Sequence, residues 1–585
     1  MLELLIKYAR DHLPIPPEPG FSAKDVRWAI DCDELGSFLD AIELGDTSQK
    51  KNRGQRFPKC PDMNLGEMKA EGITKSHFLI ETADVIALLT KKPNDEKLLA
   101  KHQYFKSLLK EVSSVMPQLG MLAGELSKPE VIDSIRQRLG TLKAKPTDKV
   151  TFRIGEVFPV ESDCWHDWWR NFRSKLTRDK SADLMRCFAS GALIEPARTN
   201  PKIRGLTDVG GLATGDVLIG FKQNSFCSFG LEQALNAAVS DDMAATYCAA
   251  LNDLIRKTGQ RMAGTKVIHW FKGKDVPKDD DPLYWLEEGQ TQQELNAQHR
   301  AKELLDAIRK GQRPDLGGNY YYALTLSGAS GRIMVRDWME GKFEGLVKNI
   351  FDWFEDFFIV QRDGKDLARS PKFLAVLGST VRELDELANP FVAKMWRVAV
   401  HGEPIPEAAL AKAFSRVKVD ILKDEPLNHA GMGLLKAYHV RNNRIKGGKT
   451  MVEDMKPYLN ENHPHPAYQC GRLLAVLSKL QKSALGDVGA GIIQRYYAAA
   501  SSTPALVIGR LTRNSQAHLN KLQPGLATLY ENIIAGIWGR MKDNVPATLT
   551  LEEQTLFALG YYQQMAYREA AASEKENQIK EGKNG

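Results

Sequence analysis

The sequence of 585 residues predicts an α+β fold, a mixed α/β N-terminal body followed by an all-α C-terminal helical bundle. Two patterns predict it. Residues 149–154 carry apolar side chains at every second position, as a half-buried strand does, whereas residues 343–440 and the segments after them follow helical periodicity. Because 585 residues exceed one ordinary core, we expect an N-terminal body at 1–342, a helical connecting region at 343–440 and a basic bundle at 441–585.

Composition predicts a cytoplasmic protein. Hydrophobic residues make up 43% and charged residues 26%, which is typical of globular chains. The sequence has no run of about 18 apolar residues, so we expect no membrane span. Glu3 interrupts the first apolar stretch, so we expect no secretory signal. The seven cysteines are scattered without a CxxC pair, which favours reduced thiols and argues against a structural zinc site.

The N-terminal part alternates between helical and extended patterns. Residues 2–9 predict a short amphipathic helix, and the prolines of 14–19 terminate it. Residues 25–45 are consistent with strands, and residues 94–142 predict helices. A basic, Pro-containing loop at 196–205 precedes a Gly-rich turn.

Trp165, Trp168 and Trp169 lie beside Arg170 and Arg173 in a predicted helix. An aromatic cluster with arginines can stack nucleobases. More often such a cluster is a core face whose arginines extend to solvent, and we favour that interpretation.

Residues 220–254 are the most informative stretch. The apolar run 217–221 predicts a buried strand, and the polar residues 222–225 follow it. Gly230 allows a turn with positive φ. Ser240 and the two aspartates after it predict a helix start. From Met243 to Leu254, apolar residues then recur on one helical face.

This stretch resembles the large subunit of the type I-C CRISPR surveillance complex, Cascade, which finds DNA with a guide RNA. In that family an Asn-rich turn and an aromatic residue precede a Ser-aromatic-Gly step and a Tyr-containing helix. The matching residues are Asn224, Phe226, Ser228, Phe229, Gly230, Gln233, Asn236, Ala237, Val239, Ser240, Tyr247, Ala250, Leu251 and Asn252. Further matches occur at both ends of the chain, so the resemblance covers most of its length.

The resemblance implies a non-catalytic, DNA- and RNA-binding subunit that acts in antiviral defence. Such a subunit reads the protospacer-adjacent motif in double-stranded DNA, helps open the duplex into an R-loop, holds the displaced strand and helps recruit a helicase–nuclease. The implied partners are guide RNA, the double-stranded DNA target, the Cascade backbone and crRNA-processing subunits, and that helicase–nuclease.

Two polar loops are the candidates for motif reading. A basic loop at 48–61 precedes residues 69–79, which resemble the family's Gly-Ile-x-x-x-Phe-Leu segment, and the second loop is 222–225. Their polar groups can bond base edges, although a solvated hairpin loop is the alternative for the first. The candidate residues are Lys69, Gly72, Thr74, Lys75, Ser76, Lys222, Gln223, Asn224 and Ser225.

The C-terminal quarter holds the whole excess of positive charge. Residues 431–585 contain 19 Lys and Arg against 12 Asp and Glu, which equals the net charge of +7. Such an excess is typical of polyanion contacts, and a merely basic surface is the alternative. Residues 441–449 predict a cationic linker, and five helices follow at 467–485, 492–499, 505–522, 527–541 and 551–571. The candidate contacts to the displaced strand are Arg441, Arg444, Lys446, Lys449, Arg472, Arg510, Arg513 and Asn514.

The resemblance also implies a second product of this gene. In the type I-C family the C-terminal helical domain resembles the separate Cascade small subunit, which can arise by translation from inside the large-subunit gene. Met451 and Met455 lie between the predicted linker and the first bundle helix. A start at Met451 would give 135 residues, enough for an independent helical domain.

Catalytic motifs are not evident. The sequence has no HExxH, GxSxG or GxxxxGK[ST] pattern, and no GxGxxG opens a helix after a strand. We therefore expect no cofactor, no metal and no enzymatic activity. The alternative is a cytosolic enzyme of unknown reaction with a helical C-terminal domain.

Overall fold

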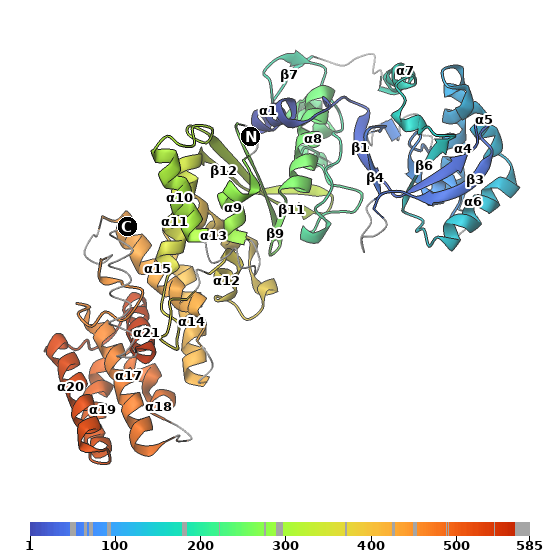
Figure 1. Ribbon diagram of the computed structural model, residues 1–585. Helices are drawn as coiled ribbons and strands as arrows, with labels where there is room; N and C mark the ends of the chain where they lie inside the picture. The colour runs from blue at the N-terminus through green and yellow to red at the C-terminus, as the bar shows by residue number, and fades with distance from the viewer. Residues whose placement is uncertain are drawn as a thin grey trace. The chain divides into compact units, whose positions relative to one another are not determined.

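The computed structural model describes residues 1–46, 54–63, 67–68, 74–90, 95–177, 184–221, 223–273, 276–287, 297–368, 371–423, 427–447, 453–486, 488, 491–542 and 544–567. The chain forms two compact units (Figure 1). The first comprises Met1–Gly259 and Leu326–Val335, and the second comprises Gln260–Thr325 and Arg336–Gly585. Mixed strands and helices with a helical C-terminal region confirm the predicted α+β fold. The three-part division stays a prediction.

A four-stranded sheet with helices packed on it forms the core of the first unit. Its strands, in the order β3-β2-β6-β5, are β2 (Trp28–Cys32), β3 (Phe38–Glu43), β5 (Glu81–Thr82) and β6 (Lys149–Ile154). β2 runs parallel to β6 and antiparallel to β3. The helices, all within the predicted helical stretch, are α4 (Glu96–Glu111), α5 (Pro117–Glu125) and α6 (Pro129–Thr141). Phe105 of α4 stacks on Phe152 of β6 at 6.0 Å between ring centroids, so the alternating pattern of β6 is confirmed.

The tryptophan cluster belongs to the core, as we favoured. Trp165 and Trp169, at the start of α7 (His166–Thr177), are fully buried, and both pack against Phe78. The Trp169 indole N–H donates to the backbone of the ribbon formed by β1 (Phe21–Val26) and β4 (Gln55–Pro61), at Gly20 O. Arg170 reaches outward to Glu18 at 2.5 Å. Trp165 and Trp169 therefore belong to the core and are not available to stack bases.

Helix α8 (Asp241–Lys257) begins where the capping pattern predicts. The Ser240 hydroxyl accepts a hydrogen bond from the Met243 amide at 3.3 Å. Tyr247 and Leu251 on the predicted apolar face are buried, and Asp253 accepts a hydrogen bond from Tyr8 of α1 (Leu2–His12) at 2.9 Å. The predicted buried strand at 217–221 is wrong, because this segment is half-buried and forms only an isolated bridge to residue 332.

The second unit starts with a sheet in the order β12-β11-β10-β9. Its strands are β9 (Gln260–Met262), β10 (Thr265–Phe271), β11 (Tyr320–Ala329) and β12 (Arg332–Lys342), and the tip of the last two belongs to the first unit. Ser330 and Gly331 form the turn of the β11–β12 hairpin, and both have positive φ, which matches the twist of a tight hairpin. Between β10 and β11 the chain forms α9 (Pro282–Glu287) and α10 (Ala297–Arg309).

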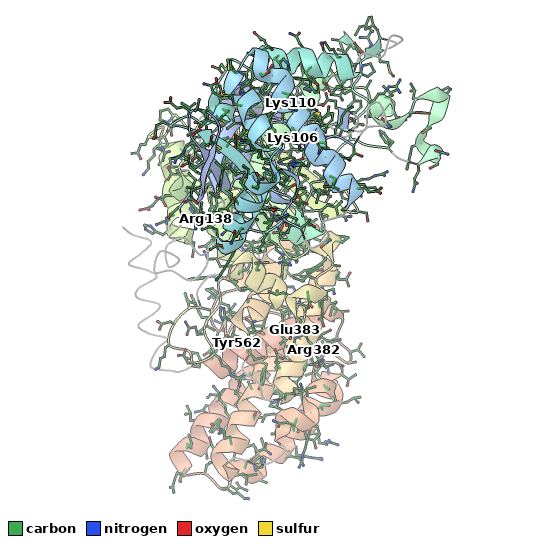
Figure 2. All side chains as sticks on the ribbon, turned by 90° about the vertical axis from the view of Figure 1, so that its right-hand side faces the viewer. Lys106, Lys110, Arg138, Arg382, Glu383 and Tyr562 are labelled. Atoms are coloured by element: carbon green, nitrogen blue, oxygen red, sulfur yellow. The ribbon has the colours of Figure 1, made fainter. Side chains whose placement is uncertain are left out.

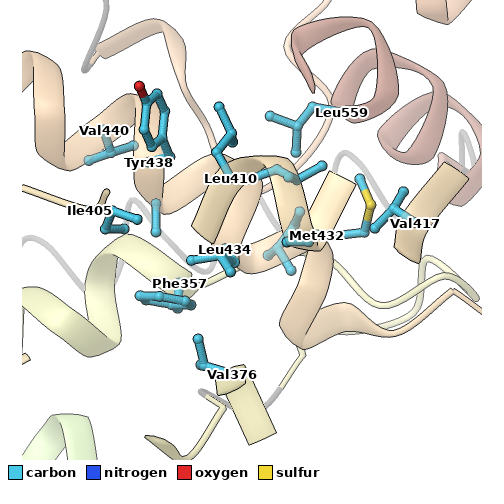
Figure 3. Packing of buried hydrophobic residues seen from close by; sticks show 14 of the residues in the cluster. Phe357, Val376, Ile405, Leu410, Val417, Met432, Leu434, Tyr438, Val440 and Leu559 are labelled. Atoms are coloured by element: carbon cyan, nitrogen blue, oxygen red, sulfur yellow. The ribbon is translucent and has the colours of Figure 1, made fainter. Parts of the chain in front are cut away.

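Helices α11 (Phe343–Phe357), α13 (Asn389–His401), α14 (Glu407–Lys423) and α15 (His429–Ile445) continue the same apolar core. Figure 3 shows side chains from several helices meeting in one cluster: Phe357, Leu410, Met432, Leu434 and Leu559. The side chain of Asn428 caps α15 by accepting from the Ala430 amide. Because α15 extends to Ile445, the predicted linker at 441–449 is wrong over its first half, which is helical.

Five helices complete the chain, as predicted. They are α17 (Pro466–Leu485), α18 (Ile492–Ala500), α19 (Pro504–Leu519), α20 (Pro524–Met541) and α21 (Leu551–Ala566). Glycine lets α17 and α21 approach closely: a Cβ on Gly471 would lie 1.9 Å from Phe557 O, and one on Gly560 would lie 2.1 Å from Tyr468 O. Two long helices therefore cross with their backbones in contact.

Candidate nucleic-acid interface

A polar loop of short 3₁₀ turns precedes α8 in the first unit. The turns cover Asn224–Phe226, Ser228–Gly230 and Gln233–Ala237. Gln223, Asn224 and Ser225 are exposed, so their amide and hydroxyl groups are free to meet the edge of a base. Lys222, predicted with them, lies outside the described residues.

Phe229 is the most exposed large apolar side chain of the described chain. Its relative exposure is 101% and its backbone is left-handed, with φ 55° and ψ 28°. That conformation costs about 1–2 kcal/mol for a residue with a side chain. A strained backbone persists only where its surroundings fix it, and such residues gather at ligand-binding sites. Phe229 therefore has the geometry of a contact residue.

A second aromatic residue of the loop lies beside an arginine. Phe226 is 43% exposed and its ring is 5.9 Å from that of Phe221. The Arg332 guanidinium lies over the Phe226 ring at 6.0 Å. An arginine on an aromatic face combines positive charge with a flat stacking surface, which suits contact with a nucleotide.

The tip of the β11–β12 hairpin is hydrogen-bonded to the segment that leads into this loop. Val217 N–H donates to Gly331 O at 3.0 Å, and Ile333 N–H donates to Val217 O at 2.9 Å. A Cβ on Gly328 would lie 2.1 Å from the amide nitrogen of Gly211. The hairpin and the Gly-rich turn thus touch backbone to backbone, which holds the base of the loop rigidly.

The first predicted motif loop is placed differently. Lys69 and Gly72 lie outside the described residues. Thr74 is half-buried, whereas Lys75 and Ser76 are only 1% and 0% exposed. Neither of these two side chains can reach a base while the segment keeps this position, so we leave Lys75 and Ser76 out of the candidate interface.

Two of the predicted phosphate-binding arginines are structural. Arg441 is 2% exposed, and its Nε donates to Asp356 Oδ2 at 2.8 Å. Arg472 is also 2% exposed and donates to Gln564 Oε1 at 2.9 Å. Burial lowers the pKa of Arg472. Because both guanidinium groups lie inside the protein, we also leave them out of the candidate interface.

The remaining predicted cations lie at the surface. Arg444 is 39% exposed although it pairs with Asp356, and Lys446 is exposed. Arg510, Arg513 and Asn514 are exposed on α19, whereas Lys449 lies outside the described residues. From Pro466 to Met541 the sequence has eight Lys and Arg against two Asp and Glu. Helices α17–α20 therefore carry a surface depleted of acids.

The two histidines that precede α17 make structural hydrogen bonds. His463 and His465 accept backbone amides at 3.2 Å through their Nδ1 atoms, His465 as the cap of α17. Among the described residues, no group of three or more His, Cys, Asp or Glu side chains could hold a metal ion. In the same residues, every helix is too short or too polar to cross a bilayer.

Sequence reasoning missed two candidate contact residues. Phe229 entered only as a point of resemblance, and no contact was assigned to Arg332. An aromatic residue directly before a glycine in a polar loop is the one local signal that could have marked Phe229. Its full exposure, by contrast, depends on the tertiary structure.

A family model described as CRISPR-associated protein (Cas_Csd1) matches residues 5–568, which is nearly the whole chain. A search of curated proteins found no match.

Proposed function

Because the chain belongs to the Cas_Csd1 family of CRISPR-associated proteins, we propose that it is the non-catalytic large subunit of a type I-C Cascade. It acts in the cytoplasm in antiviral defence, with guide RNA and the backbone and crRNA-processing subunits. It reads the protospacer-adjacent motif of double-stranded DNA, helps open the duplex for guide pairing, and helps recruit the helicase–nuclease. In this division of labour, pairing supplies sequence specificity and protein reads only the short motif.

The loop at 223–230 is the observation that carries the proposal. Gln223, Asn224 and Ser225 offer donors and acceptors for a base edge, and Phe229 next to them is wholly exposed in a strained backbone. Apolar side chains that enter DNA unstack neighbouring base pairs. We propose that the polar residues read the motif and that Phe229 stacks on the first base pair to open.

The scarcity of acidic residues on α17–α20 supports a role in holding the displaced DNA strand. Arg510 and Arg513 project from α19, and the Arg510 guanidinium lies 5.4 Å from the ring centre of Tyr496. Tyr496 is half-buried, and cations beside an aromatic ring are typical of single-strand contacts. We propose that this surface holds the displaced DNA strand.

An internally translated small subunit would consist of α17–α21. Met455 is 7% exposed in the core, and Met451 lies outside the described residues. In the full chain, α21 bonds to segments that precede α17: His439 of α15 lies 2.8 Å from Thr555, and Tyr562 donates to Val360 O. A free product would expose that face, so we expect it only bound within the complex. A C-terminal tag should reveal a short second band that disappears when both methionines become Leu, and a band that persists would refute these starts.

Duplex opening is tested with the assembled complex and two DNA targets. One target is fully paired, and the other carries a mismatched bubble at the first positions after the motif. Phe229→Ala should weaken binding to the paired target roughly 5- to 150-fold, because stacking on a base contributes about 1–3 kcal/mol. Binding to the bubble, which is already open, should change little.

Phe188→Ala is the matched control. Phe188 lies between the short strands β7 (Met185–Arg186) and β8 (Leu193–Ile194) of the same unit and is 71% exposed. It should leave both affinities unchanged, whereas Phe229→Trp should retain opening. Equal loss on both targets would refute duplex opening, and a chain that purifies without guide RNA would refute the proposed function as a whole.

A further inference from the structure

A cavity lined by three cations lies in the second unit, between α14 and the loop that follows α12 (Phe373–Gly378). Its volume is about 470 Å³. Arg382 lines it from the loop, and Lys412 and Arg416 line it from α14. Pockets for small ligands have volumes of about 300–1,000 Å³. The cavity can therefore take a few side chains or a small molecule, and it cannot enclose a duplex.

Two of the three cations share one face of α14. Lys412 and Arg416 are four residues apart on this helix, so their Cβ atoms lie about 5–6 Å from each other. The same face contributes Ala411, Ser415 and Val419 to the lining. The Ser415 hydroxyl donates to Ala411 O at 2.8 Å. Two positive charges thus border the same small and largely apolar surface.

The loop opposite α14 has a fixed backbone. The Thr380 hydroxyl donates to Leu377 O at 2.7 Å, and the Arg382 amide donates to Glu386 Oε2 at 3.2 Å. Val381 between them is buried. The Arg382 side chain is nevertheless exposed, and Figure 2 labels it at this loop. A rigid turn therefore presents the Arg382 guanidinium to the cavity.

The cations of the cavity outnumber its carboxylates. Among the described residues that line it, Glu386 supplies the one carboxylate. Of the three cations described there, only Arg416 forms an ion pair, with its guanidinium 3.6 Å from Asp420 Oδ1. Asp420 lines the adjoining cavity of about 400 Å³, which Arg416 also borders. The positive charges of Arg382 and Lys412 are thus available to an anion from outside.

The loop also limits the kind of anion that fits. After Arg382 it continues with three exposed carboxylates, Glu383, Asp385 and Glu386. A nucleic-acid strand carries a phosphate at every nucleotide, so a strand laid over the cavity would continue past these carboxylates and be repelled. A peptide can instead place one or two carboxylates in the cavity and an uncharged or basic residue beside the loop. The charge pattern therefore favours a peptide.

Resting on the proposed function, we propose that this cavity binds an acidic peptide segment of a neighbouring protein subunit in the assembled complex. The planar guanidinium of Arg382 can bond both oxygens of a carboxylate, and Lys412 adds a point charge. Val381 and Val419, which also line the cavity, suit an apolar side chain next to the acidic one. The contact belongs to the second unit, whereas the candidate motif loop at 223–230 belongs to the first.

Zero-length coupling in the assembled complex tests the contact directly. A carbodiimide activates a carboxylate, which then forms an amide with an amine that touches it. Lys412 should become linked to an Asp or Glu of another subunit, and mass spectrometry identifies the linked peptides. Lys394 is the internal control, because its Nζ lies 2.5 Å from Glu403 Oε2. It should link within the chain whether or not the other subunits are present.

Charge reversal measures what each cation contributes to assembly. Arg382→Glu and Lys412→Glu should each weaken binding of this chain to the remaining subunits about 2- to 30-fold, because an exposed attractive pair becomes a repulsive one. Lys418→Glu is the matched control, since Lys418 also lies on α14 and does not line the cavity. It should leave this affinity unchanged. Arg416 stays intact because it pairs with Asp420. Thermal unfolding shows whether each variant folds like the wild type.

Reversal of the partner's charge completes the test. The carboxylate that couples to Lys412 is replaced by Lys in the partner subunit. The altered partner should bind the wild-type chain more weakly and should regain affinity for the Lys412→Glu chain. Equal affinity of the altered partner for both chains would overturn the proposal.

The remaining outcomes separate this contact from the function as a whole. If the wild-type complex assembles, Lys412 couples to no other subunit and both variants bind like the Lys418 control, this proposal is overturned and the proposed function stands. If the variants keep every protein subunit but lose guide RNA or target DNA, the cavity holds a phosphate, which also overturns it. If the wild-type chain does not assemble with guide RNA and the backbone subunits, the proposed function fails together with this inference.

Discussion

Asp356 is the residue whose removal should damage the second unit most. It is 1% exposed and accepts from Arg441 Nε at 2.8 Å and from Arg444 Nη2 at 2.5 Å. Arg441 also donates to Val398 O at 2.6 Å. The Asp356→Ala change therefore leaves the Arg441 charge inside the protein without a carboxylate.

The expected loss of folding stability follows from the burial of the Arg441 charge. Removing one member of a buried pair costs about 3–5 kcal/mol, because the other charge remains desolvated. Arg444, at 39% exposed, can turn to solvent and adds little. For a unit of this size, such a loss lowers the melting temperature by roughly 6–10 °C.

Thermal unfolding followed by circular dichroism measures this loss, with Asp352→Ala as the control. Asp352 lies one turn earlier on α11, is 22% exposed, and binds Lys348 at 2.5 Å. Its loss should cost under about 1 kcal/mol. Replacing Asp356 and Arg441 together by Leu and Met should recover much of the stability. Equal melting temperatures for the Asp356 and Asp352 variants would refute the assignment of Arg441 as a structural residue.

Three further predictions follow from the described geometry. Burial lowers the pKa of His439 to about 3 and that of His463 to about 4, so only the unfolded chain gains these protons below pH 6.5. The contribution of these two histidines to stability should be constant above about pH 7 and fall toward pH 4, by up to about 1.4 kcal/mol per pH unit for each histidine; equal melting temperatures at pH 7.5 and 5 would contradict this. Gly328→Ala should displace the loop support and weaken DNA binding, whereas Gly345→Ala, with open space around it, should not. Arg513→Gln should reduce the slope of log affinity for the target against log salt concentration by about one. An unchanged slope would mean that α19 carries only a solvated basic surface.

Elements that depend on local pattern could be predicted from the sequence. The five C-terminal helices follow apolar periodicity and proline or glycine boundaries, and Ser240 caps α8 through its own hydroxyl. In these cases the determining residues lie within a few positions of one another. The apolar run at 217–221 failed because its backbone pairs with residue 332, which leaves a single bridge and no strand ladder.

Roles that depend on distant partners could not be predicted. Arg441 looks like a linker cation until Asp356, 85 positions earlier, is seen to face it. Lys75 has the charge of a surface contact and is buried. A charged side chain is found inside only when the fold supplies a partner, and one sequence does not show which partner that is. Net charge therefore shows that the C-terminal quarter is basic without separating its structural arginines from its exposed ones.

Phe229 and Lys149 show the same limit of sequence-based prediction, one as an exposed apolar residue and the other as a partly buried charged residue. Phe229 is apolar, so composition assigns it to a core, yet the turn that ends at Gly230 holds its ring in solvent. Lys149 is charged, so alternation assigns it to a strand's exposed end, yet burial, followed by repulsion from Arg204 and Lys24, lowers its pKa. Each residue stands in an environment that opposes its own solvation preference. Such conflicts concentrate where a protein meets a ligand, and they appear only once the distant segments are brought together.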